Sequence, residues 1–233
     1  MRTLGLIGGM SWESTLPYYR LINERVRDRM GGLHSAKLLL YSVDFAEIEA
    51  LQHRGEWNAA GDLLADAAVR LQHAGAQALV ICTNTMHRVA AQVEAATTVP
   101  LLHIADATAR RIHAAGIHSV GLLGTRFTME QAFYRERLER PGLQVVVPDA
   151  PARERIHAVI YDELCRGLIR EQSREFFVGA IAALVEQGVQ GVILGCTEIA
   201  LLVDTESAPV PLFDTARIHA EDAADWAMAN LPA

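Results

Sequence analysis

Two short polar turns, each placed after an apolar run, carry residue types that can move protons. The turn at residues 82–85 (Cys-Thr-Asn-Thr) follows the run 78–81, and the turn at 196–198 (Cys-Thr-Glu) follows the run 191–195. A cysteine between the end of a strand and the start of a helix is in an environment that lowers the pKa of its thiol, and the thiolate is the useful base or nucleophile. We therefore interpret Cys196 as a candidate proton-transfer residue.

The other two cysteines are interpreted as structural, and the histidines are scattered along the chain. Side chains alternate along a strand, so Cys82 is expected to point away from the side that Thr83 faces. Cys165 lies in a helical stretch and is expected in the core. His87 follows Asn84 and Thr85 and could support the site, but a position on a helix surface is favoured. Three cysteines without a CxxC pair are expected to be reduced thiols of a cytoplasmic protein. No His/Cys cluster has metal-ligand spacing, so no metal site is expected.

The two polar turns belong to a longer internal duplication. Three pairs of segments match in the same order along the chain: 5–9 with 121–125, 78–85 with 191–198, and 99–101 with 210–212. A repeat period of about half the chain indicates a duplicated domain rather than a solenoid. Two similar halves that each offer a polar strand end favour a site between them, with one reactive group presented to each face of a substrate.

The elements that would position these turns alternate between strand and helix. Strands are expected over 3–7, 37–43, 78–82, 101–104, 119–123, 145–147, 191–195 and 210–213. Helices are expected over 12–30, 62–73, 86–96, 107–115, 128–138, 153–166, 173–187 and 216–229, with a loop or short helix at 44–54. Ser11 and Thr128 are the expected N-caps of two of these helices, and 148–155 is the expected loose linker.

This alternation predicts an α/β fold with two similar, pseudo-symmetric domains, each a mainly parallel sheet flanked by helices. The active site is expected in the cleft between the domains, because ligands of such sheets sit beyond the carboxyl ends of the strands. We expect the first domain to comprise residues 1–103 and 213–233, and the second to comprise 104–212.

Composition excludes several classes of function. The 233 residues carry a formal net charge of −7, so the chain lacks the basic surface that nucleic-acid binding requires. No apolar run approaches the roughly 20 residues of a membrane span. Hydrophobic residues make up 51% of the chain, which is enough for one large core or two small ones. The expected partner is a small molecule.

Four strings in this chain resemble the aspartate/glutamate racemase family. They are 7–11 (Ile-Gly-Gly-Met-Ser), 82–87 (Cys-Thr-Asn-Thr-Met-His), 123–125 (Leu-Gly-Thr) and 195–198 (Gly-Cys-Thr-Glu). The resemblance spans essentially the whole chain and is greatest to the branch described as an L-aspartate/glutamate-specific, broad-substrate amino-acid racemase. It implies a homodimer of two-domain chains that uses neither pyridoxal phosphate nor a metal. It also implies α-proton abstraction on one face of the substrate and reprotonation on the other.

The resemblance further implies roles for individual residues. Most family members place one cysteine from each half at the substrate α-carbon, and Cys196 matches the second of these. Thr83 stands where most members have the first cysteine, and the similar branch shares this threonine as the partner of a single cysteine. A Thr/Cys pair is therefore expected here, with slow turnover that favours one enantiomer. The implied substrate-binding residues are Met10, Gln52, Asn84, Thr85, Thr125, Thr197 and Glu198.

Two other functions remain open from the sequence. A decarboxylase of the arylmalonate type or a hydantoin racemase would need only one well-placed thiol, which Cys196 supplies. A non-catalytic amino-acid-binding protein could keep the cleft and lack one base. The donor of the second proton is also open, because Thr83, a water molecule or a shifted Cys82 could supply it.

Overall fold

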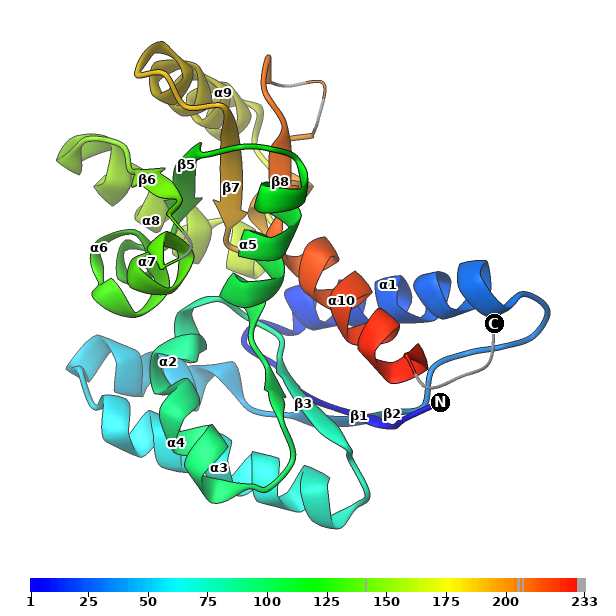
Figure 1. Ribbon diagram of the computed structural model, residues 1–233. Coiled ribbons are helices and arrows are strands. Elements are labelled where there is room, and N and C mark those ends of the chain that lie inside the picture. Colours follow the sequence, from blue (N-terminus) through cyan, green and yellow to red (C-terminus); the bar gives the residue numbers. More distant parts are fainter. Residues whose placement is uncertain (141, 205, 207, 230–233) are drawn as a thin grey trace. The chain divides into compact units, whose positions relative to one another are not determined.

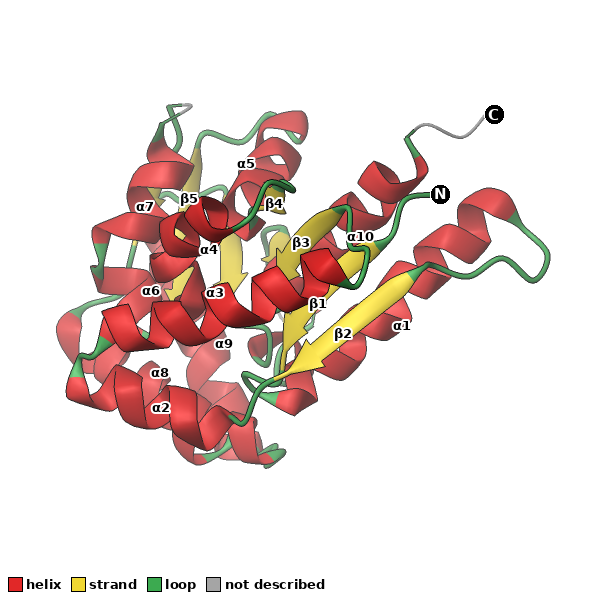
Figure 2. Ribbon diagram, turned by 90° about the horizontal axis from the view of Figure 1, so that it is seen from below, coloured by secondary structure: helices red, strands yellow, loops and turns green. Residues whose placement is uncertain are grey.

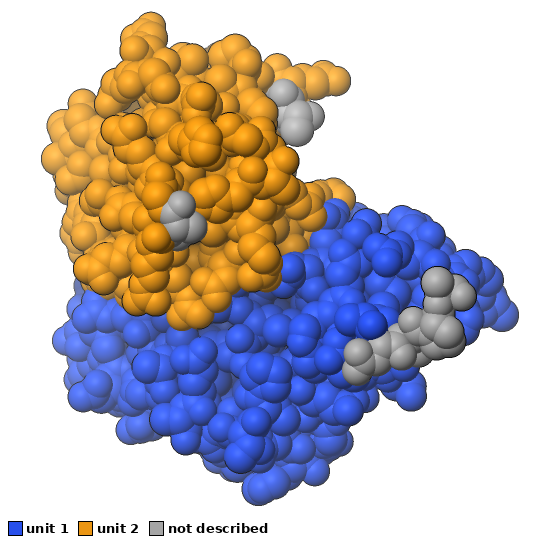
Figure 3. All heavy atoms as spheres, in the orientation of Figure 1, with its two compact units in different colours: residues 1–104, 219–233 blue, residues 105–218 orange. Residues whose placement is uncertain are grey.

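The computed structural model describes residues 1–140, 142–204, 206 and 208–229. These residues form two compact units, which Figure 3 shows in different colours. Unit 1 consists of Met1–Ile104 and His219–Ala233, and unit 2 consists of Ala105–Ile218. The chain therefore leaves the first unit once and returns to it near its end. The domain limits expected from the sequence, with the return at residue 213, remain a prediction.

Unit 1 is built on a four-stranded sheet with helices on both faces. Its strands are β1 (Leu4–Gly8), β2 (Leu38–Ser42), β3 (Ala78–Ile81) and β4 (Leu101–Leu102). Its helical elements are α1 (Trp12–Met30), α2 (Phe45–Arg54), α3 (Trp57–His73), the 3-10 turn η1 (Thr85–Val89), α4 (Ala90–Ala96) and most of α10 (Thr215–Met228). Helix α1 covers one face of the sheet and α3 the other, as Figures 1 and 2 show.

Unit 2 repeats this plan. Its strands are β5 (Ser119–Gly124), β6 (Gln144–Val146), β7 (Gly191–Gly195) and β8 (Leu212–Asp214). Its helical elements are α5 (Ile104–Ala114), α6 (Arg126–Glu130), α7 (Ala132–Glu139), α8 (Ala150–Asp162), η2 (Leu164–Arg166), α9 (Glu171–Glu186) and η3 (Ile199–Leu201). Strand β8 pairs in parallel with β7 and so belongs to the second sheet. Figure 1 shows β6, β5, β7 and β8 side by side.

The two sheets have the same strand order, β2-β1-β3-β4 and β6-β5-β7-β8, and the strand pairs in both are parallel. This equivalence confirms the expected α/β fold with two similar halves. The order reverses between β1 and β3 in unit 1, and between β5 and β7 in unit 2. In open α/β sheets, ligands bind at the carboxyl ends of the strands that flank such a switch point. The two polar turns singled out from the sequence follow β3 and β7, which lie at these points.

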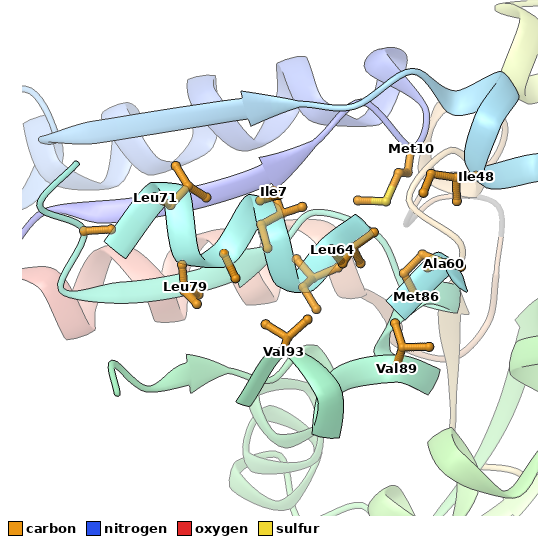
Figure 4. Packing of buried hydrophobic residues seen from close by; sticks show 14 residues of the cluster. Ile7, Met10, Ile48, Ala60, Leu64, Leu71, Leu79, Met86, Val89 and Val93 are labelled. Carbon is orange, nitrogen blue, oxygen red and sulfur yellow. The ribbon is translucent and has the colours of Figure 1, made fainter. Parts of the chain in front are cut away.

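The core of unit 1 explains why its strands read as continuous apolar runs. Ile7 and Leu79 on the sheet pack with Leu64 of α3 and Val93 of α4, and each of the four is fully buried (Figure 4). Strands covered on both faces lack a polar side, which is the pattern of parallel sheets. On α3, the buried residues recur at helical spacing, so the helix presents one apolar face to the sheet.

Two glycines allow close backbone approaches at the strand ends. Gly9 has φ 91°, and a Cβ there would lie 2.2 Å from the carbonyl oxygen of Val43. A Cβ on Gly195 would lie 2.8 Å from the carbonyl oxygen of Leu123 on the neighbouring strand. Since real Cβ atoms do not approach so closely, the turns that carry the candidate residues require glycine at these positions.

The starts of α3, α6 and α8 are among the helix starts that differ from the sequence prediction. Helix α3 begins at Trp57, whose ring lies 4.2 Å from the guanidinium of Arg88. The expected linker 148–155 contains the first turns of α8, because Asp149 accepts a hydrogen bond from the amide of Ala152 and caps the helix. The single helix expected over 128–138 is two helices in the structure, α6 and α7, and the N-cap of α6 is Thr125 rather than the expected Thr128.

Candidate active site

In unit 1, the turn after β1 is fixed by hydrogen bonds from the first turn of α1. The hydroxyl of Thr15 accepts from the amide of Gly9 at 2.8 Å and donates to the carbonyl of Ser11 at 3.0 Å. Ser14 donates to the same carbonyl at 2.9 Å. Ser11 occupies the expected N-cap position, although its side chain makes no capping hydrogen bond. The expected binding residue Met10, 4% exposed, lies in this turn.

The side chains of Met10 and the expected binding residue Gln52 reach the same buried region of unit 1. Met10 belongs to the apolar cluster that also contains Ile48 and Met86, as Figure 4 shows. Gln52, on the inward face of α2, donates from Nε2 to the sulfur of Met86 at 3.0 Å. The structure thus brings the turn after β1, α2 and the turn after β3 together through Met86.

The turn after β3 presents Thr83 and buries the residues around it. Thr83 is half-buried and its amide donates to the carbonyl of Ile81 at 2.9 Å, which ends the strand. Asn84 and Thr85 follow as buried polar residues at 1% and 5% exposure. His87 is also buried, so the expectation of a helix-surface histidine is wrong: η1 folds back and places its ring against the backbone of Thr83.

Cys82 has the surroundings of an inert thiol. It is fully buried, and its Sγ lies 3.9 Å from the carbonyl oxygen of Val80. Burial raises the pKa of the Cys82 thiol far above its ordinary value, because the thiolate would lose its hydration. A thiol of this kind is a poor proton donor and a poor base near neutral pH.

The burial of Cys82 predicts a pH dependence of stability. Its pKa is raised in the folded protein, so the unfolded chain ionises first and the stabilisation is lost as pH rises above about 8.5. The slope is about 1.4 kcal/mol per pH unit for one thiol. We expect Cys82→Ala to be less stable than wild type at pH 7.5 and to close that gap by about 2 kcal/mol at pH 10 in urea unfolding. Val93→Ala is the non-ionisable control, and a pH-independent gap for Cys82→Ala would contradict the prediction.

In unit 2, three donors converge on one buried carboxylate after β7. The Glu198 side chain is 2% exposed. Its Oε2 accepts from Thr197 Oγ1 at 2.7 Å and from Cys196 Sγ at 3.1 Å. Its Oε1 lies 3.8 Å from the Cys165 thiol. Hydrogen bonds to a carboxylate are stronger than those between neutral groups, so this cluster fixes the direction of the Cys196 thiol.

The expectation that its position lowers the pKa of Cys196 is wrong. Burial, followed by the negative charge of Glu198 and the neighbouring Cys165, raises the pKa of the Cys196 thiol well above its ordinary value. A backbone hydrogen bond from Glu198 acts in the opposite direction and is outweighed. Cys196 is therefore a thiol at neutral pH, hydrogen-bonded to a carboxylate that can accept its proton.

Cys165 is the residue of this cluster that the sequence did not identify. It was expected in the core, but it is partly exposed on η2 and reaches Glu198 with its thiol. Burial and the charge of Glu198 raise the pKa of the Cys165 thiol. The contact depends on how η2 packs after α8, and no local motif around Cys165 predicts that packing.

Thr125 lies at the end of β5, the strand that pairs with β7. Its side chain caps α6 by accepting from the amide of Thr128 at 3.3 Å, and the two hydroxyls are 3.2 Å apart. Thr125 is 5% exposed. The carboxyl ends of β5 and β7 therefore bring Thr125 to the same edge of the sheet as Cys196.

Each unit thus gathers its own set of expected site residues at one edge of its sheet. Unit 1 holds Met10, Gln52, Thr83, Asn84 and Thr85, and unit 2 holds Thr125, Cys196, Thr197 and Glu198. Within the described ranges, no group of three or more His, Cys, Asp or Glu side chains is arranged to hold a metal ion. Among the described helices, none is both long and apolar enough to span a membrane.

Comparisons with known proteins give the following matches. The family model described as Asp/Glu/Hydantoin racemase matches residues 7–223. The broad specificity amino-acid racemase RacX of Bacillus subtilis (strain 168) is 22% identical over 227 residues, covering 91% of this chain and 92% of that protein. A candidate Asp/Glu racemase from Yersinia pestis has a solved structure with 59% identity, a TM-score of 0.91 and coverage of 98% of this chain and 100% of its own. An aspartate racemase homologue from Pyrococcus horikoshii OT3 is 36% identical, with a TM-score of 0.84 and coverage of 97% and 99%.

Proposed function

The chain belongs to the Asp/Glu/hydantoin racemase family, and from that premise we propose that it is an amino-acid racemase acting on aspartate and glutamate without a cofactor. The observation that carries the proposal is the end of β7, where the Cys196 thiol is hydrogen-bonded to the buried Glu198 carboxylate. The name of the relative RacX supports a substrate range that extends to other amino acids.

The proposal assigns Cys196 to one face of the substrate α-carbon and Thr83 to the other. In one direction, the Cys196 thiol donates its proton to the carbanion. In the other direction it must act as a base, and its proton first passes to Glu198 Oε2, 3.1 Å away. Thiolate and carboxylic acid replace thiol and carboxylate in that step, so the charge of the pair does not change.

The α-proton of an amino acid is weakly acidic, so the site must stabilise the negative charge that develops on the carboxylate. Pre-organised donors aimed at that charge are usually the largest single contribution to such catalysis. We assign this role to the turns at 84–85 and 196–198, with Asn84, Thr85 and Thr197 holding the amino and carboxylate groups. Met10, Gln52, Glu198 and Thr125 complete the proposed binding set.

Thr83 is the weaker partner of the proposed pair. A threonine hydroxyl is a poor acid and base near neutral pH. Cys82 cannot replace it in the observed arrangement, because it is fully buried and its thiol faces the carbonyl of Val80 rather than a carboxylate that could accept its proton, as Glu198 can for Cys196. The Thr/Cys pair therefore supports slow turnover with a preference for one enantiomer.

The experiment that tests the proposal follows the substrate in D₂O. Purified protein is incubated with L-glutamate and, separately, with L-aspartate, and NMR reports loss of the α-proton while chiral chromatography reports the D/L ratio. Exchange with inversion supports the racemase. Binding without exchange would replace it with an amino-acid-binding protein. Absence of both would direct the next assays to hydantoins and arylmalonates, the substrates of the single-cysteine alternatives.

The proposal also includes a cytoplasmic homodimer, as the family resemblance implies. The three cysteines are free thiols, which suits a reducing compartment. Trp12, Leu16 and Tyr19 form an exposed apolar row on α1, each about 60% accessible, that a second copy would cover. Light scattering of the purified protein gives its mass, and a monomer at micromolar concentration would contradict the dimer.

A further inference from the structure

His87 is attached by a side-chain hydrogen bond to the backbone of Thr83, the proposed weak partner in proton transfer. The ring is 3% exposed, and its Nδ1 lies 2.8 Å from the carbonyl oxygen of Thr83. A carbonyl oxygen only accepts hydrogen bonds, so Nδ1 carries the hydrogen and donates it.

The second ring nitrogen of His87 fixes its protonation state. The amide of Ile104 donates to Nε2 at 3.3 Å. An amide only donates, so Nε2 must be without hydrogen, and the ring is the neutral tautomer with hydrogen on Nδ1. Protonation would place two N–H groups against each other and remove one bond. Because both nitrogens are engaged by the backbone, His87 is not itself an acid or base for a substrate.

The surrounding aromatic residues hold the His87 ring in place. The His103 ring centroid is 4.3 Å away and the His219 ring centroid is 5.8 Å away. His219 is held by hydrogen bonds of its own, because its Nε2 donates to the carbonyl of Leu102 at 2.7 Å and its Nδ1 lies 2.9 Å from the Tyr18 hydroxyl. The imidazole that contacts Thr83 is thus packed among rings whose positions are themselves set by hydrogen bonds.

The hydrogen bond from His87 is the second of two that hold the backbone of Thr83. The amide of Thr83 donates to the carbonyl of Ile81 at 2.9 Å, and its carbonyl accepts from His87. With both backbone groups engaged, the position of the Thr83 backbone and the direction of its Cα–Cβ bond are fixed. Orientation matters most for a weak acid or base, since a misplacement of about 1 Å can cost roughly 100-fold in rate.

We propose that His87 is a positioning residue for proton transfer by Thr83, acting through its Nδ1–H hydrogen bond to the Thr83 carbonyl. This inference rests on the proposed function and deepens it, because the sequence favoured a helix-surface position for His87 and the family resemblance assigned it no role. It predicts that loss of the Nδ1 donor impairs the proton transfer by Thr83, whereas the proton transfer by Cys196 is unchanged.

Two substitutions separate the two hydrogen bonds of His87. The side-chain amide of His87→Asn can place a donor at the position of Nδ1, so this variant keeps the bond to Thr83 and loses the acceptor for Ile104. His87→Gln can place an acceptor near the position of Nε2 and loses the donor to Thr83. His219→Gln is the matched control, because it perturbs the same group of rings without touching Thr83.

The measurement compares inversion with solvent exchange in D₂O for both enantiomers of glutamate. We expect His87→Gln to lower kcat for inversion by roughly 100-fold, with KM little changed and with exchange at Cys196 retained. His87→Asn and His219→Gln should keep the wild-type ratio of inversion to exchange. Equal loss of exchange and inversion in His87→Gln would show general damage and overturn the inference, as would wild-type inversion by His87→Gln.

The failure of this inference can be distinguished from failure of the proposed function. If wild type inverts and His87→Gln inverts equally well, only the role of His87 is overturned. Wild-type exchange without inversion would overturn it as well, because no transfer by Thr83 would exist to be positioned. If wild type shows no exchange, the proposed function fails and the role of His87 falls with it.

Discussion

Replacing Cys196 with alanine is expected to lower exchange of the substrate α-proton by about three orders of magnitude, and inversion by at least as much. The thiol is the one strong proton-transfer group that the proposal places at the substrate. Its removal leaves Thr83, whose hydroxyl is a very poor base near neutral pH. The measurement is NMR of α-proton loss in D₂O with both enantiomers of glutamate and aspartate.

The choice of controls follows from the surroundings of the three thiols. Cys82→Ala removes a fully buried thiol that contacts the carbonyl of Val80 and should keep the wild-type exchange rate. Cys196→Ser tests whether any hydroxyl suffices, and we expect it to be nearly as inactive as Cys196→Ala. Retained exchange in Cys196→Ala, with native thermal stability, would show that another group removes the proton.

The arrangement around Cys196 gives that prediction its physical basis. The pKa of Cys196 is raised, so the thiol starts as an acid and its conjugate base is strong once formed. Glu198 is the adjacent group that can take the proton, and its carboxylate is held by Thr197 as well as by the two thiols. A buried carboxylate with several donors keeps its geometry, which is what a short proton transfer requires.

Much of the fold followed from the sequence because its signals are local. The apolar runs at 78–81 and 191–195 predicted buried parallel strands, and the helix at 12–30 was placed at its observed limits. The matched segments predicted two equivalent halves, which the identical strand orders confirm. Polar residues directly after strands predicted the edges at which the candidate residues gather.

The features that the sequence did not reveal depend on contacts between distant segments. His87 lies in a short 3-10 turn, where the periodicity that separates buried from exposed faces is absent, and its partner Ile104 lies 17 residues further along the chain. Cys165 reaches Glu198 only because η2 packs beside the end of β7. The predicted direction of the pKa shift of Cys196 was wrong because burial, together with the charge of the nearby Glu198, outweighs the effect of the strand-end position.

Substitutions of Thr83 can test the proposal by a gain of activity as well as by a loss. Thr83→Val keeps the shape of the side chain and removes the hydroxyl, and we expect it to lower inversion by about 100-fold while exchange at Cys196 continues. Thr83→Cys places a thiol where most members of the family have one. Because a thiol can ionise much closer to neutral pH than a hydroxyl, we expect Thr83→Cys to raise inversion by about tenfold or more and to reduce the preference for one enantiomer.

The structure makes Thr83→Cys a conservative test. Thr83 is half-buried, its backbone is held by Ile81 and His87, and cysteine is the smaller side chain, so the substitution introduces no crowding. Kinetics of inversion in both directions, measured for wild type, Thr83→Val and Thr83→Cys, separate the possible proton donors. Unchanged inversion in Thr83→Val would assign the second proton to water, because the hydroxyl would be absent and Cys82 is buried beneath the turn. Loss in Thr83→Val together with gain in Thr83→Cys would identify position 83 as the second proton-transfer site.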